Sequence, residues 1–181
     1  IIGIGGIGVN ALQGAQHAGA RNVVAVDPLE YKRSRAAEFG ATHAVATLDE
    51  AVALCDQLTH GVGADAAIIT TGTVEEHQVT AAFNAIRKGG IVVITGMGKL
   101  DDLTVRLSST MMALYKKTVK GTLFGDANPT ADIPKLLTLY VNGRLKLDEL
   151  ITRRYSLEDV NTGYDDLQAG INIRGIIDLA L

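Results

Sequence analysis

The stretch that decides the fold is Ile-Ile-Gly-Ile-Gly-Gly-Ile-Gly, residues 1–8, in which Gly3, Gly5 and Gly8 have the spacing of a dinucleotide-binding turn. In such a turn the first glycine allows a tight bend, and the second lets the backbone approach a pyrophosphate. The third lets the following helix pack closely, with its amino end facing the phosphates. Only two residues precede Gly3, whereas strands usually have about 5–6. We therefore expect a truncated first strand and a chain that continues a longer polypeptide.

Beyond this turn, apolar runs alternate with stretches of helical period, which is typical of βαβ units in a doubly wound parallel sheet. The pattern predicts strands over residues 1–4, 22–27, 43–46, 65–71, 91–95 and 118–124. It predicts helices over residues 7–18, 29–39, 48–59, 74–88, 108–115 and 129–140. The prediction is an α/β Rossmann domain with a six-stranded parallel sheet.

Two further stretches depart from this pattern. The sequence Leu-Thr-Val-Arg-Leu, from Leu103 to Leu107, alternates apolar and polar residues and predicts a half-buried edge strand. After the expected sheet is complete, residues 150–155, 157–169 and 174–179 predict a strand, a helix and a strand that have no place in it. We therefore assign residues 1–145 to a dinucleotide-binding domain and residues 146–181 to a separate C-terminal segment.

Composition excludes several classes of function. The chain has 181 residues, of which 47% are hydrophobic and 20% charged, and its net charge of −3 favours neither a nucleic-acid nor a membrane partner. No run approaches the roughly 18 apolar residues of a membrane span. The single cysteine, Cys55, excludes an internal disulfide framework and a cysteine-built zinc site, so a cytoplasmic setting is expected.

Asp27 ends the second predicted strand, close to the expected spacing of about 20 residues after the turn. There its carboxylate would accept hydrogen bonds from the adenosine ribose, each worth about 1.5–3 kcal/mol, and would repel a 2′-phosphate. This favours NAD over NADP, although Lys32, Arg33 and Arg35 qualify the preference because a nearby arginine can receive that phosphate. The alternative is that Asp27 only caps a helix that begins at Pro28.

No cluster of catalytic acids, bases or metal ligands stands out in the sequence. Cys55, beside Leu54 and Leu58 in a predicted helix, has the pattern of a small buried hydrophobe rather than a nucleophile. A dinucleotide domain without chemistry of its own supplies binding and orientation, so the substrate site must come from elsewhere. A glycine-rich turn with no ligand remains the alternative for residues 3–8.

The chain as a whole resembles the cofactor-binding domain of the medium-chain, zinc-dependent alcohol dehydrogenases, nearest to their thiol-dependent formaldehyde dehydrogenase branch. Five motifs carry the resemblance. They are Gly3-Ile4-Gly5-Gly6-Ile7-Gly8, Val26-Asp27, Glu38-Phe39-Gly40-Ala41-Thr42, Lys120-Gly121-Thr122-Leu123-Phe124-Gly125 and Gly170-Ile171-Asn172-Ile173-Arg174.

The resemblance implies a role for particular residues. Ile7 would pack on the nicotinamide, Asp27 and Lys32 would hold the adenosine ribose, and Arg174 would reach the pyrophosphate. Four residues at the carboxyl ends of later strands would line the nicotinamide pocket, namely Thr71, Gly96, Met97 and Phe124. The whole expected cofactor-binding set is Gly3, Gly5, Gly6, Ile7, Gly8, Asp27, Lys32, Thr71, Gly96, Met97, Phe124 and Arg174.

The resemblance also implies an activity and partners. The complete enzyme would transfer a hydride from a small alcohol, or a hydroxymethyl–thiol adduct, to NAD, with zinc held by ligands in an absent N-terminal domain. This chain alone would be inactive, its tail would belong to the absent catalytic domain, and residues 103–107 would lie near a contact of a homodimer or tetramer.

Three alternatives remain open. One is a zinc-free NADPH quinone or enoyl reductase of the same superfamily, and another is a non-enzymatic dinucleotide-binding protein. A methyltransferase also uses a glycine turn and an acidic residue after the second strand, but its sheet needs an antiparallel final strand, which the pattern does not predict.

Overall fold

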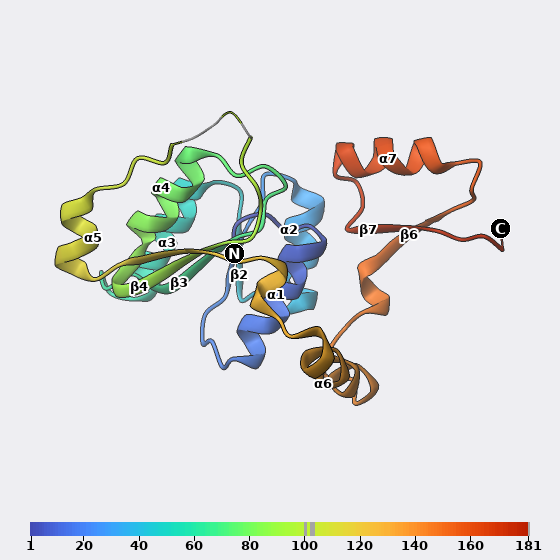
Figure 1. Ribbon diagram of the computed structural model, residues 1–181, viewed down its shortest axis with the longest axis horizontal. Helices are drawn as coiled ribbons and strands as arrows, with labels where there is room; N and C mark the ends of the chain where they lie inside the picture. The colour runs from blue at the N-terminus through green and yellow to red at the C-terminus, as the bar shows by residue number, and fades with distance from the viewer. Residues whose placement is uncertain (100, 102–103, 181) are drawn as a thin grey trace. The chain divides into compact units, whose positions relative to one another are not determined.

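The computed structural model describes residues 1–99, 101 and 104–180, and the chain divides into two compact units, Ile1–Asp126 and Ala127–Leu181 (Figure 1). The first unit contains a parallel sheet with helices packed on it. The second begins just before helix α6 (Pro129–Val141), which the sequence assigns to the dinucleotide-binding part. That assignment, and the division at residues 145 and 146, stay predictions.

The first unit alternates strands and helices along the chain. Its strands are β1 (Val24–Val26), β2 (His43–Val45), β3 (Ala64–Ile69), β4 (Ile86–Ile94) and β5 (Thr118–Gly121). Its helices are α1 (Gly6–His17), α2 (Glu30–Ala36), α3 (Leu48–Leu58), α4 (Glu76–Ala85) and α5 (Ser109–Tyr115), with short 3₁₀ turns η1 (Ala37–Phe39) and η2 (Phe124–Asp126). Every strand pairing in it is parallel, so the predicted α/β class is confirmed.

The strand order identifies the place where a ligand can bind. β1 pairs with β2, while β3, β4 and β5 pair in sequence, and Ile2 bridges Val26 on one side and Ile69 on the other. The order is therefore β2, β1, Ile2, β3, β4, β5, with Ile2 where the sequence predicts the first of six strands. Because the chain runs outward in both directions from Ile2, right-handed crossovers put α1 and α2 on one face and α4 on the other. Ligands of such sheets bind where the order reverses.

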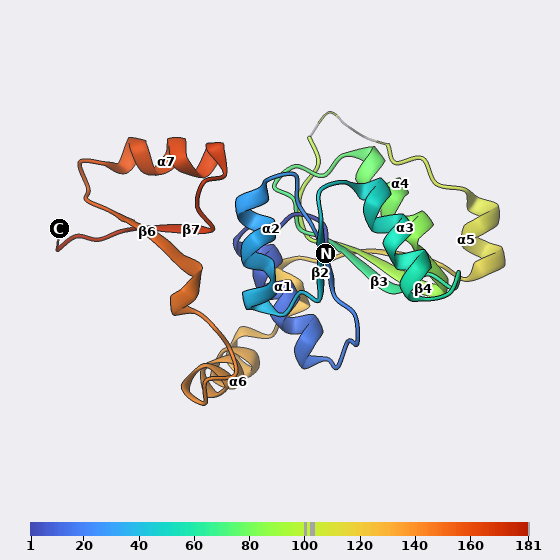
Figure 2. The ribbon, with the colours of Figure 1, turned by 180° about the vertical axis from the view of Figure 1, so that it is seen from behind.

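Buried apolar side chains hold the helices on this sheet. Ile4, Leu12 and Phe39 are at most 1% exposed, as are Val79 and Val92 on the other elements. Helix α3 begins at a capping box, in which the Thr47 hydroxyl accepts from the Glu50 N–H at 3.2 Å and the Glu50 carboxylate accepts from the Thr47 N–H at 3.3 Å. Helices α3 and α4 pack against each other (Figure 2).

One predicted helix is shorter than expected. The sequence predicts a helix over residues 74–88, but α4 ends at Ala85 and β4 begins at Ile86. The reason is tertiary, because Ile86 buries its side chain in the core and is only 2% exposed. Arg87 lies in β4, and its Nε donates to Asp65 Oδ1 on the neighbouring strand β3 at 2.6 Å.

The predicted edge strand from Leu103 to Leu107 is wrong for the described residues 104–107, which belong to no strand; residue 103 lies outside the described residues. This segment instead lies against helix α4. The Thr80 hydroxyl donates to the Arg106 carbonyl at 3.4 Å, and Leu107 packs against the core cluster. The alternating pattern thus reflects one side chain inserted into the core rather than a pleated strand.

The second unit contains α6, η3 (Asp148–Leu150), β6 (Ile151–Tyr155), α7 (Val160–Ala169) and β7 (Arg174–Ile177). β6 and β7 pair in parallel and α7 packs on β7, so the predicted strand, helix and strand form one βαβ unit. Tyr155 fixes their arrangement, since its hydroxyl donates to Asp166 Oδ2 at 2.7 Å and accepts from Asn172 Nδ2 at 3.1 Å.

Candidate nucleotide-binding site

A cleft of about 690 Å³ lies where the strand order of the first unit reverses. Its walls come from the carboxyl ends of four parallel segments: the glycine turn after Ile2, the loop after β1, the loop after β2 and the loop after β3. Five of the predicted site residues line it, namely Gly3, Gly5, Asp27, Lys32 and Thr71. Residues distant in the sequence therefore meet where this fold binds ligands.

The glycine turn has positions that a residue with a side chain could not occupy without strain or a clash. Gly3 has φ of +89°, in the left-handed region that disfavours other residues. Gly5 is the N-cap of α1, so the free N–H groups of the first helical turn begin beside the cleft. A Cβ on Gly8 would lie 1.9 Å from the Gly3 carbonyl oxygen. The third glycine therefore allows α1 to start directly against the turn.

Asp27 is buried at the end of β1, with only 4% of the residue exposed. Its Oδ2 accepts from the Ile4 N–H at 2.8 Å and its Oδ1 accepts from the Leu29 N–H at 2.9 Å. Each carboxylate oxygen can accept about two bonds, so each retains an acceptor position. Leu29, not Asp27, is the N-cap of α2. Helix α2 therefore begins at Glu30 rather than at Pro28, and the choice between ribose binding and capping by Asp27 stays a prediction.

The three basic residues after Asp27 have different surroundings. Lys32 lines the cleft. Arg33 donates from Nη1 to the backbone carbonyls of Asp27 and Pro28, at 2.8 and 2.7 Å. Arg35 donates from Nε to Glu38 Oε2 at 2.8 Å. Only the lysine of this set is among the residues that line the cleft.

Thr70 is a residue that the sequence analysis missed. It is 6% exposed, and its Oγ1 lies 2.5 Å from the Gly3 carbonyl oxygen and 3.0 Å from that of Ile2. The hydroxyl thus ties the end of β3 to the glycine turn. The signal in the sequence is a polar residue that directly follows the apolar run of β3. Beside it, the Thr71 hydroxyl donates to Gln78 Oε1 at 2.9 Å.

The residues predicted to surround a nicotinamide follow other strand ends of the same unit. Ile7, in the first turn of α1, is 57% exposed. Gly96 and Met97 follow β4, and the Met97 carbonyl accepts from the Val74 N–H at 3.0 Å. Met97 and Phe124 are 81% and 89% exposed. Met97 and Phe124 are thus large exposed apolar residues that follow the carboxyl ends of β4 and β5.

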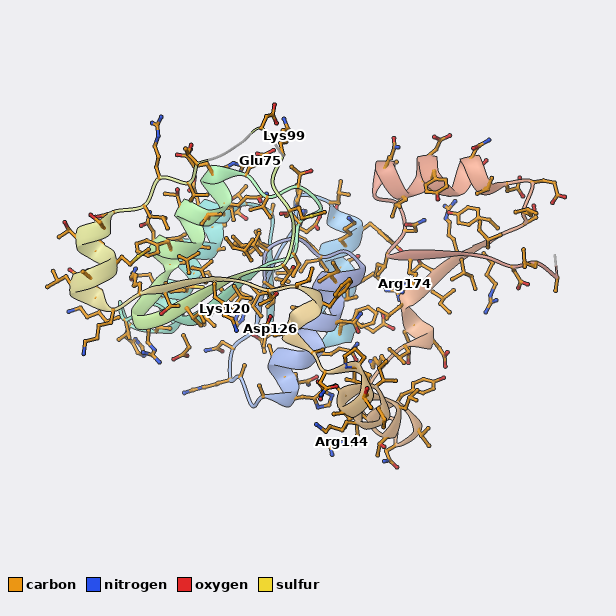
Figure 3. All side chains as sticks on the ribbon, viewed as in Figure 1. Glu75, Lys99, Lys120, Asp126, Arg144 and Arg174 are labelled. Carbon is orange, nitrogen blue, oxygen red and sulfur yellow. The ribbon has the colours of Figure 1, made fainter. Side chains whose placement is uncertain are left out.

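Phe124 has a strained backbone. Its φ is +50°, and Gly125 and Asp126 also have positive φ values of +67° and +55°. Non-glycine residues in this region cost about 1–3 kcal/mol and gather at functional sites. The turn is fixed by an ion pair of 2.5 Å between Lys120 and Asp126 (Figure 3), and the hydrogen bond from Lys120 lowers the pKa of the Asp126 carboxyl.

Gly6 is the first residue of α1. Arg174 is the exposed first residue of β7, in the second unit. The expected contact of Arg174 with a pyrophosphate stays a prediction.

Removing the Thr70 hydroxyl should loosen the turn. We expect Thr70→Val, which keeps the shape of the side chain, to lower the free energy of unfolding by about 1–3 kcal/mol because the part-buried Gly3 carbonyl loses its donor. Thr70→Ser should lose less, since it keeps the hydroxyl. Urea denaturation of the two variants measures the difference, and equal stability would show that the contact with Gly3 contributes nothing.

The strand order, the cleft where that order reverses and the carboxylate at the end of β1 define a dinucleotide-binding domain of the doubly wound type. Comparison with known proteins gives the family. The model of the zinc-binding dehydrogenases matches residues 6–142, and the chain belongs to this family.

The relatives with similar sequences include alcohol dehydrogenases. The chain is 62% identical over 177 residues to the NDMA-dependent alcohol dehydrogenase of Amycolatopsis methanolica, covering 98% of this chain and 48% of that protein. It is 55% identical to the putative alcohol dehydrogenase D of Mycobacterium tuberculosis, with the same coverage. The chain therefore spans about half the length of the relatives it matches.

Solved structures agree with this placement. Benzyl alcohol dehydrogenase from Acinetobacter calcoaceticus superimposes with a TM-score of 0.89 at 27% identity, covering 98% of this chain and 48% of that chain. The resemblance to the zinc-dependent alcohol dehydrogenases is thus confirmed. The narrower assignment to the formaldehyde dehydrogenase branch stays a prediction.

Among residues 1–99, 101 and 104–180, no group of three His, Cys, Asp or Glu side chains could hold a metal ion. No helix of the same residues is long and apolar enough to span a bilayer. Cys55 is half-buried rather than fully buried as predicted, and burial raises the pKa of its thiol, which keeps it protonated.

Proposed function

We propose that this chain is the NAD-binding part of an oxidoreductase that transfers a hydride from an alcohol, or a hydroxymethyl–thiol adduct, to NAD with the assistance of zinc. The observation that carries the proposal is the cleft that brings Gly3, Gly5 and Asp27 together where the strand order reverses. The names of the relatives, which are alcohol dehydrogenases, support the choice of substrate class.

The residues of the cleft fit a dinucleotide. The turn at Gly3 and Gly5 has no side chain between the backbone and a pyrophosphate, and the Asp27 carboxylate retains acceptor positions for ribose hydroxyls. Lys32 adds a positive charge to the wall of the cleft. Ile7 and Phe124 offer exposed apolar surface to a nicotinamide ring. When bound, NAD supplies the carbon that accepts the hydride.

Three observations favour NAD over NADP. A 2′-phosphate about 4 Å from the Asp27 carboxylate would cost about 4 kcal/mol per pair of unit charges near a surface. The guanidinium of Arg33 is engaged with backbone carbonyls, and that of Arg35 with Glu38. Lys32 alone of these three lines the cleft, and one lysine offsets only part of the repulsion.

The described residues do not fit a zinc ion, so its ligands would come from another part of the protein, together with the substrate pocket. The unit formed by β6, α7 and β7 would complete the fold of that catalytic part, and Arg174 would reach the pyrophosphate. The complete protein would be a homodimer or tetramer in the cytoplasm. Val105, which is exposed, would lie near the contact between its subunits.

A fluorescence titration tests cofactor binding. We expect the chain to bind NADH at least about tenfold more tightly than NADPH, a difference of about 1.4 kcal/mol. Reduced nicotinamide mononucleotide, which lacks the adenosine half, is the control and should bind far more weakly than NADH. Equal affinities for NADH and NADPH would contradict the role of Asp27, and tighter NADPH binding would favour a quinone or enoyl reductase. In the complete protein, zinc-supported reduction of NAD by alcohols distinguishes an enzyme from a binding protein.

A further inference from the structure

The side chain of Arg33 turns back on the loop that precedes its own helix. Its Nη1 donates to the carbonyl oxygens of Asp27 and Pro28, at 2.8 and 2.7 Å. One guanidinium nitrogen carries two hydrogens in a fixed plane, so it can serve both carbonyls at once. The contact joins β1 to the first turn of α2 through a half-buried, charged donor.

The Asp27 carboxylate makes two further hydrogen bonds that hold the same loop. That carboxylate accepts from the N–H groups of Ile4 and Leu29. Asp27 is thus bound through its backbone carbonyl by Arg33 and through its side chain by the glycine turn and the loop. Loss of the Arg33 contact would leave the loop held by the carboxylate bonds, which would then have to orient the side chain alone.

We infer that Arg33 is a positioning residue for cofactor selectivity: it fixes the Asp27 carboxylate toward the ribose site and keeps its own guanidinium away from a 2′-phosphate. This inference rests on the proposed NAD-binding function. Arg33 does not line the cleft, whereas its neighbour Lys32 does. The arginine therefore acts through Asp27 rather than by touching the cofactor.

Arg35 provides a matched control on the same helix. It carries the same charge, and its Nε donates to Glu38, one turn further along the chain, rather than to the loop. A substitution of Arg35 removes one positive charge from α2 and leaves the contacts of Asp27 and Pro28 intact. The pair Arg33→Met and Arg35→Met separates loop positioning from net charge, because methionine keeps an unbranched apolar stem.

Fluorescence titration measures the dissociation constants for NADH and NADPH in the parent chain, in Arg33→Met and in Arg35→Met. We expect the ratio of the NADPH constant to the NADH constant to fall on the order of fivefold in Arg33→Met and to change less than about twofold in Arg35→Met. Arg33→Lys, which retains a donor, should recover part of the ratio. A merely structural role would weaken both cofactors alike and leave the ratio unchanged.

Amide hydrogen exchange of Leu29 gives a second readout in the free protein. Its N–H donates to Asp27, so exchange should accelerate in Arg33→Met and not in Arg35→Met. If Arg33→Met does not fold, Arg33→Leu, which likewise lacks a donor, carries the same two measurements. A parent chain that binds neither cofactor refutes the proposed function. A parent chain that prefers NADH, with a ratio unchanged by Arg33→Met, refutes the role of Arg33 alone.

Discussion

Replacing Gly8 by alanine should abolish measurable NADH binding and lower the free energy of unfolding by roughly 3 kcal/mol. The physical reason is that the added Cβ would lie 1.9 Å from the Gly3 carbonyl oxygen and 3.0 Å from Thr70 Oγ1. A backbone carbonyl cannot rotate away as a flexible side chain can. Helix α1 would have to move from the turn and carry its amino end away from the cleft. Fluorescence titration and urea denaturation measure the two effects.

Gly14→Ala is the matched control, because it makes the same change in the same helix. A Cβ at Gly14 meets no atom within 4 Å. Alanine in an open helical position stabilises by about 0.5–1 kcal/mol relative to glycine. We therefore expect this variant to be slightly more stable than the parent chain and to bind NADH normally. A Gly8→Ala variant as stable as Gly14→Ala would show that the turn does not constrain this site.

Asp27→Asn should remove most of the preference for NADH over NADPH. We expect NADH affinity to fall about 10- to 100-fold, because a charge-assisted acceptor is lost from the ribose site. NADPH should lose little, since the repulsion between a carboxylate and a 2′-phosphate disappears. The measured quantity is the ratio of the two dissociation constants, which is insensitive to a general loss of folded protein.

Glu30→Gln is the control for the loss of one negative charge near the loop. Glu30 is exposed in the first turn of α2 and is not among the residues that line the cleft. Its substitution should leave the ratio within about twofold of that of the parent chain. If Glu30→Gln changes the ratio as much as Asp27→Asn does, selectivity comes from net charge and not from the Asp27 carboxylate.

The glycine turn, the strand sequence and Asp27 could be predicted because each leaves a local signal. Gly3, Gly5 and Gly8 are needed at fixed spacing by the geometry of the turn, and buried parallel strands require continuous apolar runs. The end of α4 could not be predicted, because the helical pattern continues past Ala85. There the burial of Ile86 and the ion pair of Arg87 with Asp65 decide in favour of strand.

By itself, the sequence determined the class of sheet, the place of the glycine turn and the position of the acidic residue after β1, because short-range patterns specify each of these. Only the tertiary structure decided which side chains form hydrogen bonds around the cleft and which remain at its wall. It brought the Thr70 hydroxyl to Gly3, 67 positions away in the chain, and directed Arg33 to two carbonyls while leaving Lys32 at the cleft. Hydrogen bonds of this kind depend on how separate strand ends meet, and no local pattern encodes that meeting.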